Sequence, residues 1–464
     1  MKKLFNNSYN KQIDGTGLAI FRIAYSIILL CEIMQMFYFR HLIFDKIPYI
    51  ELPEISSAIP ILIWAVSVVF IMVGLFTRTA TIINYIMSLV LIGTINTYEY
   101  HVFYAYMGIN FLLMFMPISQ CLSIDRLIKK EKYKQTNPTY NPPKKVRQLY
   151  YFLPVYVAIA LIYFDSIFMK LGSKSWVDGL GLWMPASFPM MTHSNLSFIL
   201  NNKSIVIFLG YLTLVFEAVF IFLFFRKKFR TILFIIGIGL HIGILIVFPI
   251  PWFALTYCSI YILLIPVSFF KLEREKSNTV ANLESYCTYK NKDIHKRILF
   301  YIIVFFTISQ IAITYNSIVA NELKNKIGFS NTTIDNGLLK ISKLTNSVTK
   351  ILFGITGHSV FIDQYHYIGY NHIISVIYQN KNRNTTWLPI INKNGQPSYY
   401  NYGTNWRKIS FSTNAPNINM NNLNKGVRDF TAFWAYKNNI NLDDAKFLIK
   451  VKKIDTPNGW EKDF

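Results

Sequence analysis

The chain has 464 residues, of which 53% are hydrophobic and only 15% are charged, and its formal net charge is +23. Because a soluble domain usually carries roughly 25% charged residues, this composition excludes an ordinary soluble protein and favours one embedded in a lipid bilayer. The positive charge does not indicate a nucleic-acid partner, since the lysines and arginines lie mainly in short segments between apolar blocks.

Nine apolar blocks, each about as long as a bilayer crossing requires, follow one another along the chain. They lie at residues 17–39, 59–77, 80–98, 102–119, 149–169, 204–225, 231–249, 252–270 and 298–319. The first block is long and lacks a small-residue cleavage site, so we expect it to remain as a helix and not to be removed as a signal peptide. The predicted fold of residues 1–319 is an all-α polytopic membrane bundle of about nine transmembrane helices.

Lysine and arginine are concentrated in alternate connecting segments. The basic segments are the N-terminus, 120–148, 226–230 and 271–297. The segments that alternate with them and hold few basic residues are 40–58, 99–101 and 170–203. Because basic loops stay in the cytoplasm, we predict a multi-pass membrane protein with a cytoplasmic N-terminus. Nine crossings then place residues 320–464 outside the cytoplasm.

Residues 320–464 have a different character. They are polar, rich in asparagine and broken by turn signals such as Asn394-Gly395. Alternating apolar runs at 372–378 and 447–451 predict strands. We therefore divide the chain into a transmembrane domain, residues 1–319, and a small C-terminal extracytoplasmic domain, residues 320–464, of α+β or mostly β type.

No metal site is predicted. The four cysteines form no CxxC pair, so neither a disulfide framework nor a structural zinc site is expected. In the C-terminal segment His358, Asp363, His366 and His372 make a loose cluster of possible ligands. A turn followed by strands is the default interpretation of that cluster.

Several ionisable side chains fall inside predicted transmembrane helices, where a charge costs at least ~2.5 kcal/mol. They are Arg22, Glu32, Asp165, Glu217 and His241. Arg22 and Glu32 are about 15 Å apart along one helix, so each needs a partner on another helix. Interhelical pairs that fix the bundle are one interpretation, favoured for Arg22, Glu32 and Glu217; a functional site is the other.

His101 and Lys170 fall at the predicted outer ends of helices. Desolvation at the edge of an apolar cavity lowers the pKa of a lysine and suits it to act as a base. The alternatives are a snorkelling interfacial lysine, which spacing alone favours for Lys170, and a helix-end cap or packing residue for His101. The sequence contains no phosphate loop, metal-spaced histidine cluster or nucleophile elbow.

The first predicted helix resembles the opening of a known superfamily. Its stretch Gly17-Leu18-Ala19-Ile20-Phe21-Arg22, followed by an acid at Glu32, is similar to the first helix of the HTTM (horizontally transferred transmembrane domain) and vitamin K-dependent γ-carboxylase superfamily. His101 before an apolar helix and Ser123-Ile124-Asp125 resemble the His-helix-Ser-x-Asp pattern of that superfamily.

The most specific part of the likeness is the stretch around Lys170. Tyr163, Lys170-Leu171 and Trp176 followed by Gly179 resemble the Tyr, Lys and Trp-x-x-Gly signature, and His241 also fits. The likeness covers roughly residues 15–270. The spacing from lysine to tryptophan is one residue longer than in the animal carboxylases, which leaves Lys174 as an alternative. The leucine after Lys170 favours Lys170.

This resemblance implies a function. In the carboxylases a reduced quinone is oxidised by oxygen, and the strong base that forms removes a γ-proton from a peptide glutamate, to which carbon dioxide adds. Lys170 then takes the role of the starting base and His101 assists. The supporting polar residues are Arg22, Glu32, Asp165, Trp176, Glu217 and His241. The implied cofactor is a reduced quinone, and the implied partners are the lipid bilayer and an exported peptide. The likeness is to a bacterial-type member of the superfamily, which implies a location in the bacterial inner membrane.

Two other functions stay open. Residues after 320 show no likeness to the large domain that grips the substrate propeptide in animal carboxylases, and one bacterial relative helps to mature an exported antimicrobial peptide in a sporulation-delaying toxin system. A non-enzymatic accessory protein for peptide maturation or export is therefore the main alternative. A transporter ranks last, because the sequence shows no inverted repeat.

Overall fold

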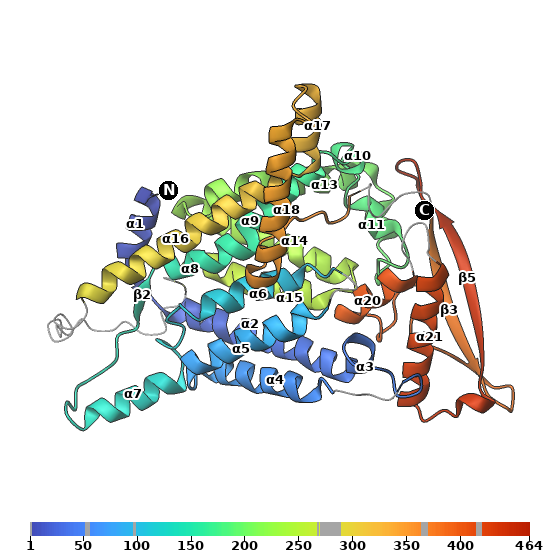
Figure 1. The fold of residues 1–464 in the computed structure, drawn as a ribbon, viewed down its shortest axis with the longest axis horizontal. Coiled ribbons are helices and arrows are strands. Elements are labelled where there is room, and N and C mark those ends of the chain that lie inside the picture. Colours follow the sequence, from blue (N-terminus) through green and yellow to red (C-terminus); the bar gives the residue numbers. More distant parts are fainter. Residues whose placement is uncertain are drawn as a thin grey trace.

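The computed structural model describes residues 2–51, 56–95, 99–266, 269, 289–362, 370–413 and 420–464. Its long helices run along the long axis of the molecule, and a small sheet lies at one end, which we call the sheet end (Figure 1). The basic helices α1 (Lys2–Asn10) and α7 (Ile124–Lys134) lie at the opposite end. These two helices and the sheet thus lie at opposite ends of the described structure.

Nine apolar helices in the described residues coincide with the nine predicted blocks, but only some are long enough to cross a membrane. The five that are long and apolar enough are α2 (Thr16–Tyr38), the continuous run Leu149–Lys170, α13 (Lys203–Leu223), Lys227–Val247 including α14 (Arg230–Val247), and Ile294–Thr314 of α16 (Tyr289–Thr314). The shorter ones are α4 (Ala58–Val73), α5 (Thr77–Gly93), α6 (Val102–Leu113), and α15 (Pro251–Tyr261) with η3 (Ile262–Leu264).

The chain is therefore a multi-pass membrane protein, and the expectation of nine full crossings is not confirmed. α6 has 12 residues, which at about 1.5 Å per residue falls well short of a hydrocarbon core ~30 Å thick. Pro117 and Pro266 follow α6 and η3, and proline disfavours continuation of a helix through the residue before it. These prolines explain why both helices end before the apolar blocks do.

The helix that ends at Lys170 is interrupted once. Pro154 lies inside α8 (Leu149–Val155), where it removes a backbone donor, and a π-helical turn, η1 (Tyr156–Ala160), follows. The chain then continues as α9 (Leu161–Lys170). A π turn changes the helical register, so it sets the face on which the side chains of α9 lie, and such turns are frequent at functional sites.

The segment after residue 320 combines helices with a three-stranded sheet, so of the two predicted types α+β is observed. The strands β3 (Tyr370–Gln379), β4 (Thr385–Trp387) and β5 (Lys446–Asp455) are antiparallel in the order β4-β3-β5. Both strands that alternation predicted are present, as β3 and β5. The helices of this segment are α17 (Ile318–Lys326), α18 (Thr333–Phe353), α20 (Thr404–Thr413) and α21 (Met420–Lys437).

This segment is joined to the bundle by packing. α18 contacts α16 and α6, and α20 contacts α2. The remaining short elements are β1 (Gln12–Asp14), α3 (Arg40–Ile43), β2 (Lys145–Arg147), α10 (Lys174–Val177), α11 (Trp183–Ser187), α12 (Ser197–Leu200), η2 (Lys227–Phe229) and η5 (Leu442–Asp444). The boundary at residue 320 remains a prediction.

Candidate functional site

A cavity of about 140 Å³ lies among α9, α13, α14, α15 and the segment before α6. Most of its wall is apolar, for example Ile162, Phe248 and Phe253. Ionisable side chains project from several elements into this wall. They are Glu99, His101, Lys170, Glu217, His241, His358 and Arg407. Four of the residues that the sequence singled out, His101, Lys170, Glu217 and His241, therefore meet in one place, and Trp176 lines it as well.

Lys170 and Glu217 form a buried ion pair in this cavity. The Nζ atom of Lys170 is 2.6 Å from Oε1 of Glu217, and the two side chains are only 8% and 6% exposed. Lys170 Nζ also lies 4.3 Å from the centroid of the Trp176 ring. In an apolar site each of these two side chains depends on the other for stabilisation of its charge.

The second carboxylate oxygen of Glu217 can accept a further hydrogen bond. Its Oε2 atom is buried and has no hydrogen-bond partner among the described residues. An unsatisfied buried acceptor is unusual in a native fold, and occupation by a ligand donor is one reason for it. Since Glu217 lines the cavity, a hydroxyl group in the cavity would satisfy Oε2.

Two histidines face each other across another part of the wall. The ring centroids of His101 and His358 are 5.4 Å apart. Neither ring nitrogen of His358 has a side-chain hydrogen-bond partner in the part of the chain that the structure describes. Burial lowers the pKa of His358 to about 3, so this imidazole is neutral at pH 7. A neutral imidazole can accept a proton on one nitrogen and donate one from the other.

Glu99 stands beside the histidines. Its Oε1 atom accepts hydrogen bonds from Tyr104 Oη and Lys350 Nζ, both at 2.7 Å. Burial raises the pKa of Glu99, but the charges of His101 and Lys350 outweigh that effect and lower it to about 2. Glu99 therefore carries a negative charge next to His101 at neutral pH.

His241 is held in one tautomer. Its Nδ1 is 2.9 Å from the carbonyl oxygen of Gly237, and its ring stacks on Tyr257 at a centroid distance of 4.7 Å. A carbonyl oxygen can only accept, so Nδ1 carries a proton, and in the neutral ring Nε2 keeps its lone pair.

The other predicted polar residues lie away from the cavity. Arg22 is fully buried and donates to the carbonyl oxygens of Ile118, at 2.8 Å, and Leu122, which joins α2 to the segment before α7. Glu32 accepts from the hydroxyls of Tyr106 and Thr404 and joins α2 to α6 and α20. The contacts of Arg22 and Glu32 agree with the structural interpretation.

Asp165 has an intermediate position. Its carboxylate accepts from Thr314 Oγ1 at 2.5 Å and from the backbone N of His358 at 2.6 Å. It therefore positions the loop that carries His358. Lys174, the alternative to Lys170, is exposed on α10 and is not part of the cavity wall.

The sequence did not reveal that the segment after residue 320 completes the cavity. His358, Val360, Phe361, Trp406 and Arg407 all line it. Arg407 Nε donates to the backbone oxygen of Glu99 at 2.6 Å. The sequence signal for this was the stretch 354–358, in which two glycines precede the histidine. Gly354 adopts a φ of +66°, and a Cβ there would clash with the backbone oxygen of Tyr104.

The structure describes only two of the four possible metal ligands, His358 and His372. No group of three or more His, Cys, Asp or Glu side chains suited to a metal ion occurs among the described residues. Asp363 and His366 lie outside the described residues. His372 is on β3, opposite Lys453 of β5, and His358 is in the cavity.

Two further cavities adjoin the first. One, of about 390 Å³, is an apolar groove between α13 and α14 that shares Leu182, Thr213, Leu240, Ile244 and Phe248 with it. The other, of about 630 Å³, lies between α5, α6 and α18 and shares Glu99 and Tyr100 with it. Lys343 and Lys350 line this second neighbour. The site thus has an apolar side and a polar, basic side.

A family model described as "HTTM domain" matches residues 10–269, which is more than half of the chain. The match includes His101, Lys170, Glu217 and His241 and ends before His358 and Arg407. No curated protein and no solved structure matches the chain.

Proposed function

Because the chain belongs to the HTTM family and is a multi-pass membrane protein, we propose that it is a carboxylase-like membrane enzyme in which Lys170 acts as a base toward a reduced quinone. The observation that carries this proposal is the buried Lys170–Glu217 pair, 2.6 Å between Nζ and Oε1, in an apolar cavity. Transfer of the shared proton to Glu217 leaves Lys170 as a neutral amine, which is the form that a lysine base needs.

The residues present fit a quinone. Apolar cavities of ~150 Å³ take up one benzene molecule, so the 140 Å³ cavity has room for about one aromatic ring. The adjoining groove of about 390 Å³ is lined by apolar side chains of α13 and α14 and suits an apolar tail. Glu217 Oε2 and His241 Nε2 are acceptors for ring hydroxyls.

When bound, a reduced quinone would supply the reducing equivalents and, with oxygen, the strong base for removal of a carbon-bound proton. The protein transfers protons and excludes water from the site. Lys170 Nζ takes a proton from a ligand hydroxyl after giving its own to Glu217 Oε1. His101 and His358 are the second pair of proton-transfer groups, next to the polar cavity.

The polar side suits an anionic co-substrate. Lys343 lines the second neighbouring cavity and is exposed, whereas the charge of Lys350 there is balanced by Glu99 at 2.7 Å. We propose that an acidic side chain of an exported peptide approaches from this side. In this proposal the N-terminus is cytoplasmic, as positive-inside charge supports, and residues 320–464 form an extracytoplasmic domain.

The direct test measures incorporation of labelled bicarbonate into exported peptides. Membranes that contain the protein are supplied with a reduced quinone, and wild type is compared with Lys170→Ala and with the matched control Lys174→Ala. Label with wild type and Lys174→Ala but not with Lys170→Ala is the expected result. If Lys170→Arg keeps full activity, the base assignment is wrong, because arginine stays protonated.

One observation favours the accessory-protein alternative. β5 is an edge strand of ten residues in the described sheet, and Leu448, Ile449 and Val451 on it are exposed. Such an edge can bind an extended peptide by strand addition. Removal of the whole C-terminal segment cannot separate the two functions, since that segment also lines the cavity. The double variant Ile449→Asp, Val451→Asp changes the strand edge and leaves the cavity intact. If this variant loses function while Lys170→Ala keeps it, the protein is the accessory protein.

A further inference from the structure

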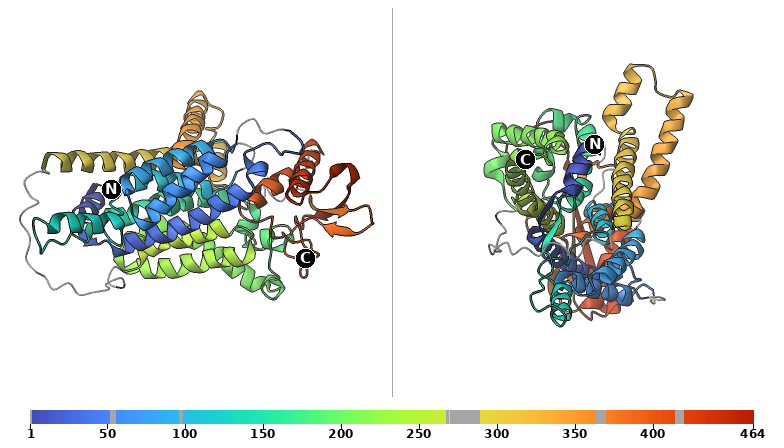
Figure 2. Two further views of the ribbon diagram at one scale, coloured as in Figure 1. Left: turned by 90° about the horizontal axis from the view of Figure 1, so that it is seen from below. Right: turned by 90° about the vertical axis from the view of Figure 1, so that its left-hand side faces the viewer.

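A helical hairpin formed by α17 (Ile318–Lys326) and α18 (Thr333–Phe353) stands out sideways from the bundle. Figure 1 and the right-hand view of Figure 2 show it projecting across the direction of the long helices. It does not extend them toward the sheet. If the long helices cross the membrane, the hairpin runs along the membrane plane.

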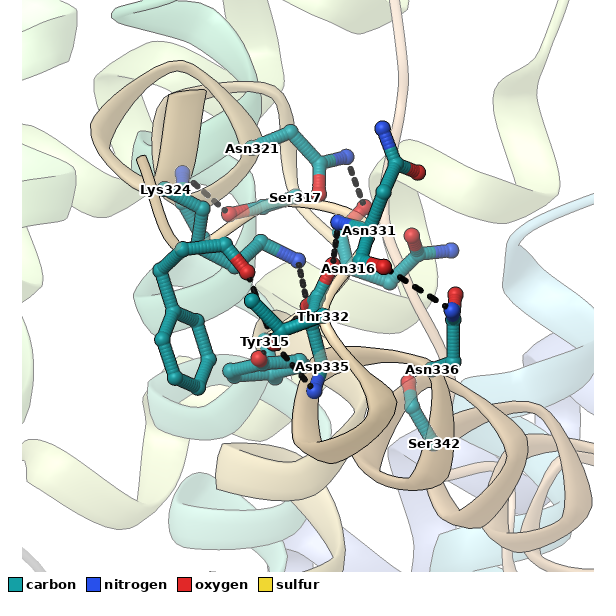
Figure 3. A network of polar contacts seen from close by, with 12 residues as sticks. Tyr315, Asn316, Ser317, Asn321, Lys324, Asn331, Thr332, Asp335, Asn336 and Ser342 are labelled. Carbon is teal, nitrogen blue, oxygen red and sulfur yellow. Dashed lines mark hydrogen bonds and ion pairs between the residues drawn. The ribbon is translucent and has the colours of Figure 1, made fainter. Parts of the chain in front are cut away.

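A polar network fixes the shape of the hairpin (Figure 3). Asp335 at the start of α18 pairs with Lys324 of α17, 3.1 Å between Nζ and Oδ1, and accepts from Tyr315 Oη at 2.7 Å. Asn331 N donates to the other oxygen of Asp335 at 3.0 Å, and Thr332 caps the helix by accepting from Asp335 N. The two helices are thus connected as one unit.

One face of α18 is apolar and exposed. Its side chains recur every three or four residues, so they share a face of the helix, and each is between 39% and 68% exposed. They are Ile334, Leu338, Ile341, Leu344, Val348 and Ile351. The buried positions Asp335, Ser342 and Thr349 face the protein instead, and a third face carries Lys340, Lys343 and Lys350.

The C-terminal end of α18 is seated among apolar membrane-type helices. Leu352 O accepts from Tyr85 Oη of α5 at 2.7 Å. The Phe353 ring lies 4.8 Å from Phe111 of α6 and 5.4 Å from Phe306 of α16, between ring centroids. Ile351 of the apolar face lies next to Gly93 of α5, so this face adjoins a helix whose Ile82, Ile86 and Val90 are also exposed.

We propose that the α17–α18 hairpin is an in-plane membrane anchor, with the apolar face of α18 in the acyl region of one leaflet and the exposed Lys340 and Lys343 at the level of the lipid phosphates, while Lys350 stays paired with Glu99. Helices with one apolar and one basic face lie in the interface in this way. An apolar stripe of this length exposed to water would be a large patch for any protein surface. The lysines match the phosphates in charge.

The anchor would support the cavity. α18 ends at Phe353, Gly354 follows it, and four residues later the chain reaches His358 in the cavity wall. Seating of α18 in the leaflet fixes the start of that short connection. The inference itself does not rest on any catalytic role for His358.

The test uses spin labels on the full-length protein in vesicles of phosphatidylcholine and phosphatidylglycerol. Single cysteines replace Ile341, Leu344 and Val348 on the apolar face, and Lys340, Lys343 and Ser347 serve as matched controls. The native cysteines are replaced by alanine. All six labelled positions are exposed, so the labels leave the core unchanged.

For each label, the collision rate with oxygen is divided by the collision rate with a water-soluble nickel chelate. This ratio is expected to be several-fold higher on the apolar face than on the control face. Equal access of the nickel chelate to both faces would show that the hairpin projects into water and would overturn the proposal. Shielding of the apolar face from both reagents, with spin–spin broadening between labels, would also overturn it, because a second copy of the chain would then cover that face.

Discussion

Removal of one partner of the Lys170–Glu217 pair should destabilise the folded protein, and removal of both should not. The two atoms are 2.6 Å apart and the side chains are 8% and 6% exposed. Lys170→Met leaves the Glu217 carboxylate buried without a cation, and breaking a buried pair in this way typically costs about 3–5 kcal/mol. Replacement of both members by apolar residues, Lys170→Met with Glu217→Leu, is expected to leave stability unchanged or to raise it by about 1–4 kcal/mol.

A double-mutant cycle measures this coupling. The free energy of unfolding of the purified protein is determined in mixed micelles as the fraction of denaturing detergent rises, for wild type, both single variants and the double variant. Lys174→Met, on an exposed lysine, is the control and should change stability by no more than about 0.5 kcal/mol.

A coupling below about 0.5 kcal/mol would refute the reasoning, because it would mean that the pair is solvated or absent in the folded protein. A large coupling has a second use. The double variant then folds without either ionisable group, so any loss of activity in it reports the chemistry of the pair and not the stability of the bundle.

Three other changes test other parts of the structure. Gly354→Ala should cost more than ~2 kcal/mol in the same unfolding assay, because φ is +66° and the new Cβ would clash with a backbone oxygen; an unchanged midpoint would contradict this geometry. Gly239 and Gly243 of α14 line the apolar groove, at positions where an added Cβ would have no atom within 4 Å. Gly239→Phe and Gly243→Phe should therefore weaken binding of a long-tailed quinone but not of a tail-free one, and Gly337→Phe on α18 should affect neither. Burial lowers the pKa of His358 to about 3, below its unfolded value of about 6.5. As the pH falls between these values, the unfolded state binds a proton that the folded state does not, and the folded protein loses roughly 1.4 kcal/mol of stability per pH unit. His358→Phe should reduce that slope, and identical pH profiles of stability for wild type and variant would contradict the burial.

The positions of the membrane helices were predictable because their signal is local. A run of about twenty apolar residues satisfies its backbone as a helix wherever it lies in a bilayer, so each block forms a helix in the described chain. The strands β3 and β5 were predictable for the same reason, since alternation of apolar and polar residues is a property of one segment. Helix length was less predictable, as α6 shows, because proline and packing end a helix before its apolar block ends.

The site was predictable only in part. Lys170, His101 and His241 stood out in the sequence through their resemblance to a family, and the structure brings them to one cavity. Arg22 and Glu32 stood out equally, as charges in an apolar helix, yet their partners lie elsewhere. Burial of a charge indicates that a partner must exist, but not which residue it is.

The sequence by itself determined that this is a multi-pass membrane protein, where its apolar helices lie, and which charges need a buried partner. Only the tertiary structure decided the pairs. Glu217 reaches Lys170 across 47 residues of sequence, and His358 joins the cavity from a segment beyond the matched family region. Propensity and hydropathy act over one turn or one span, whereas such pairs depend on how whole helices pack, and packing is a property of the complete chain.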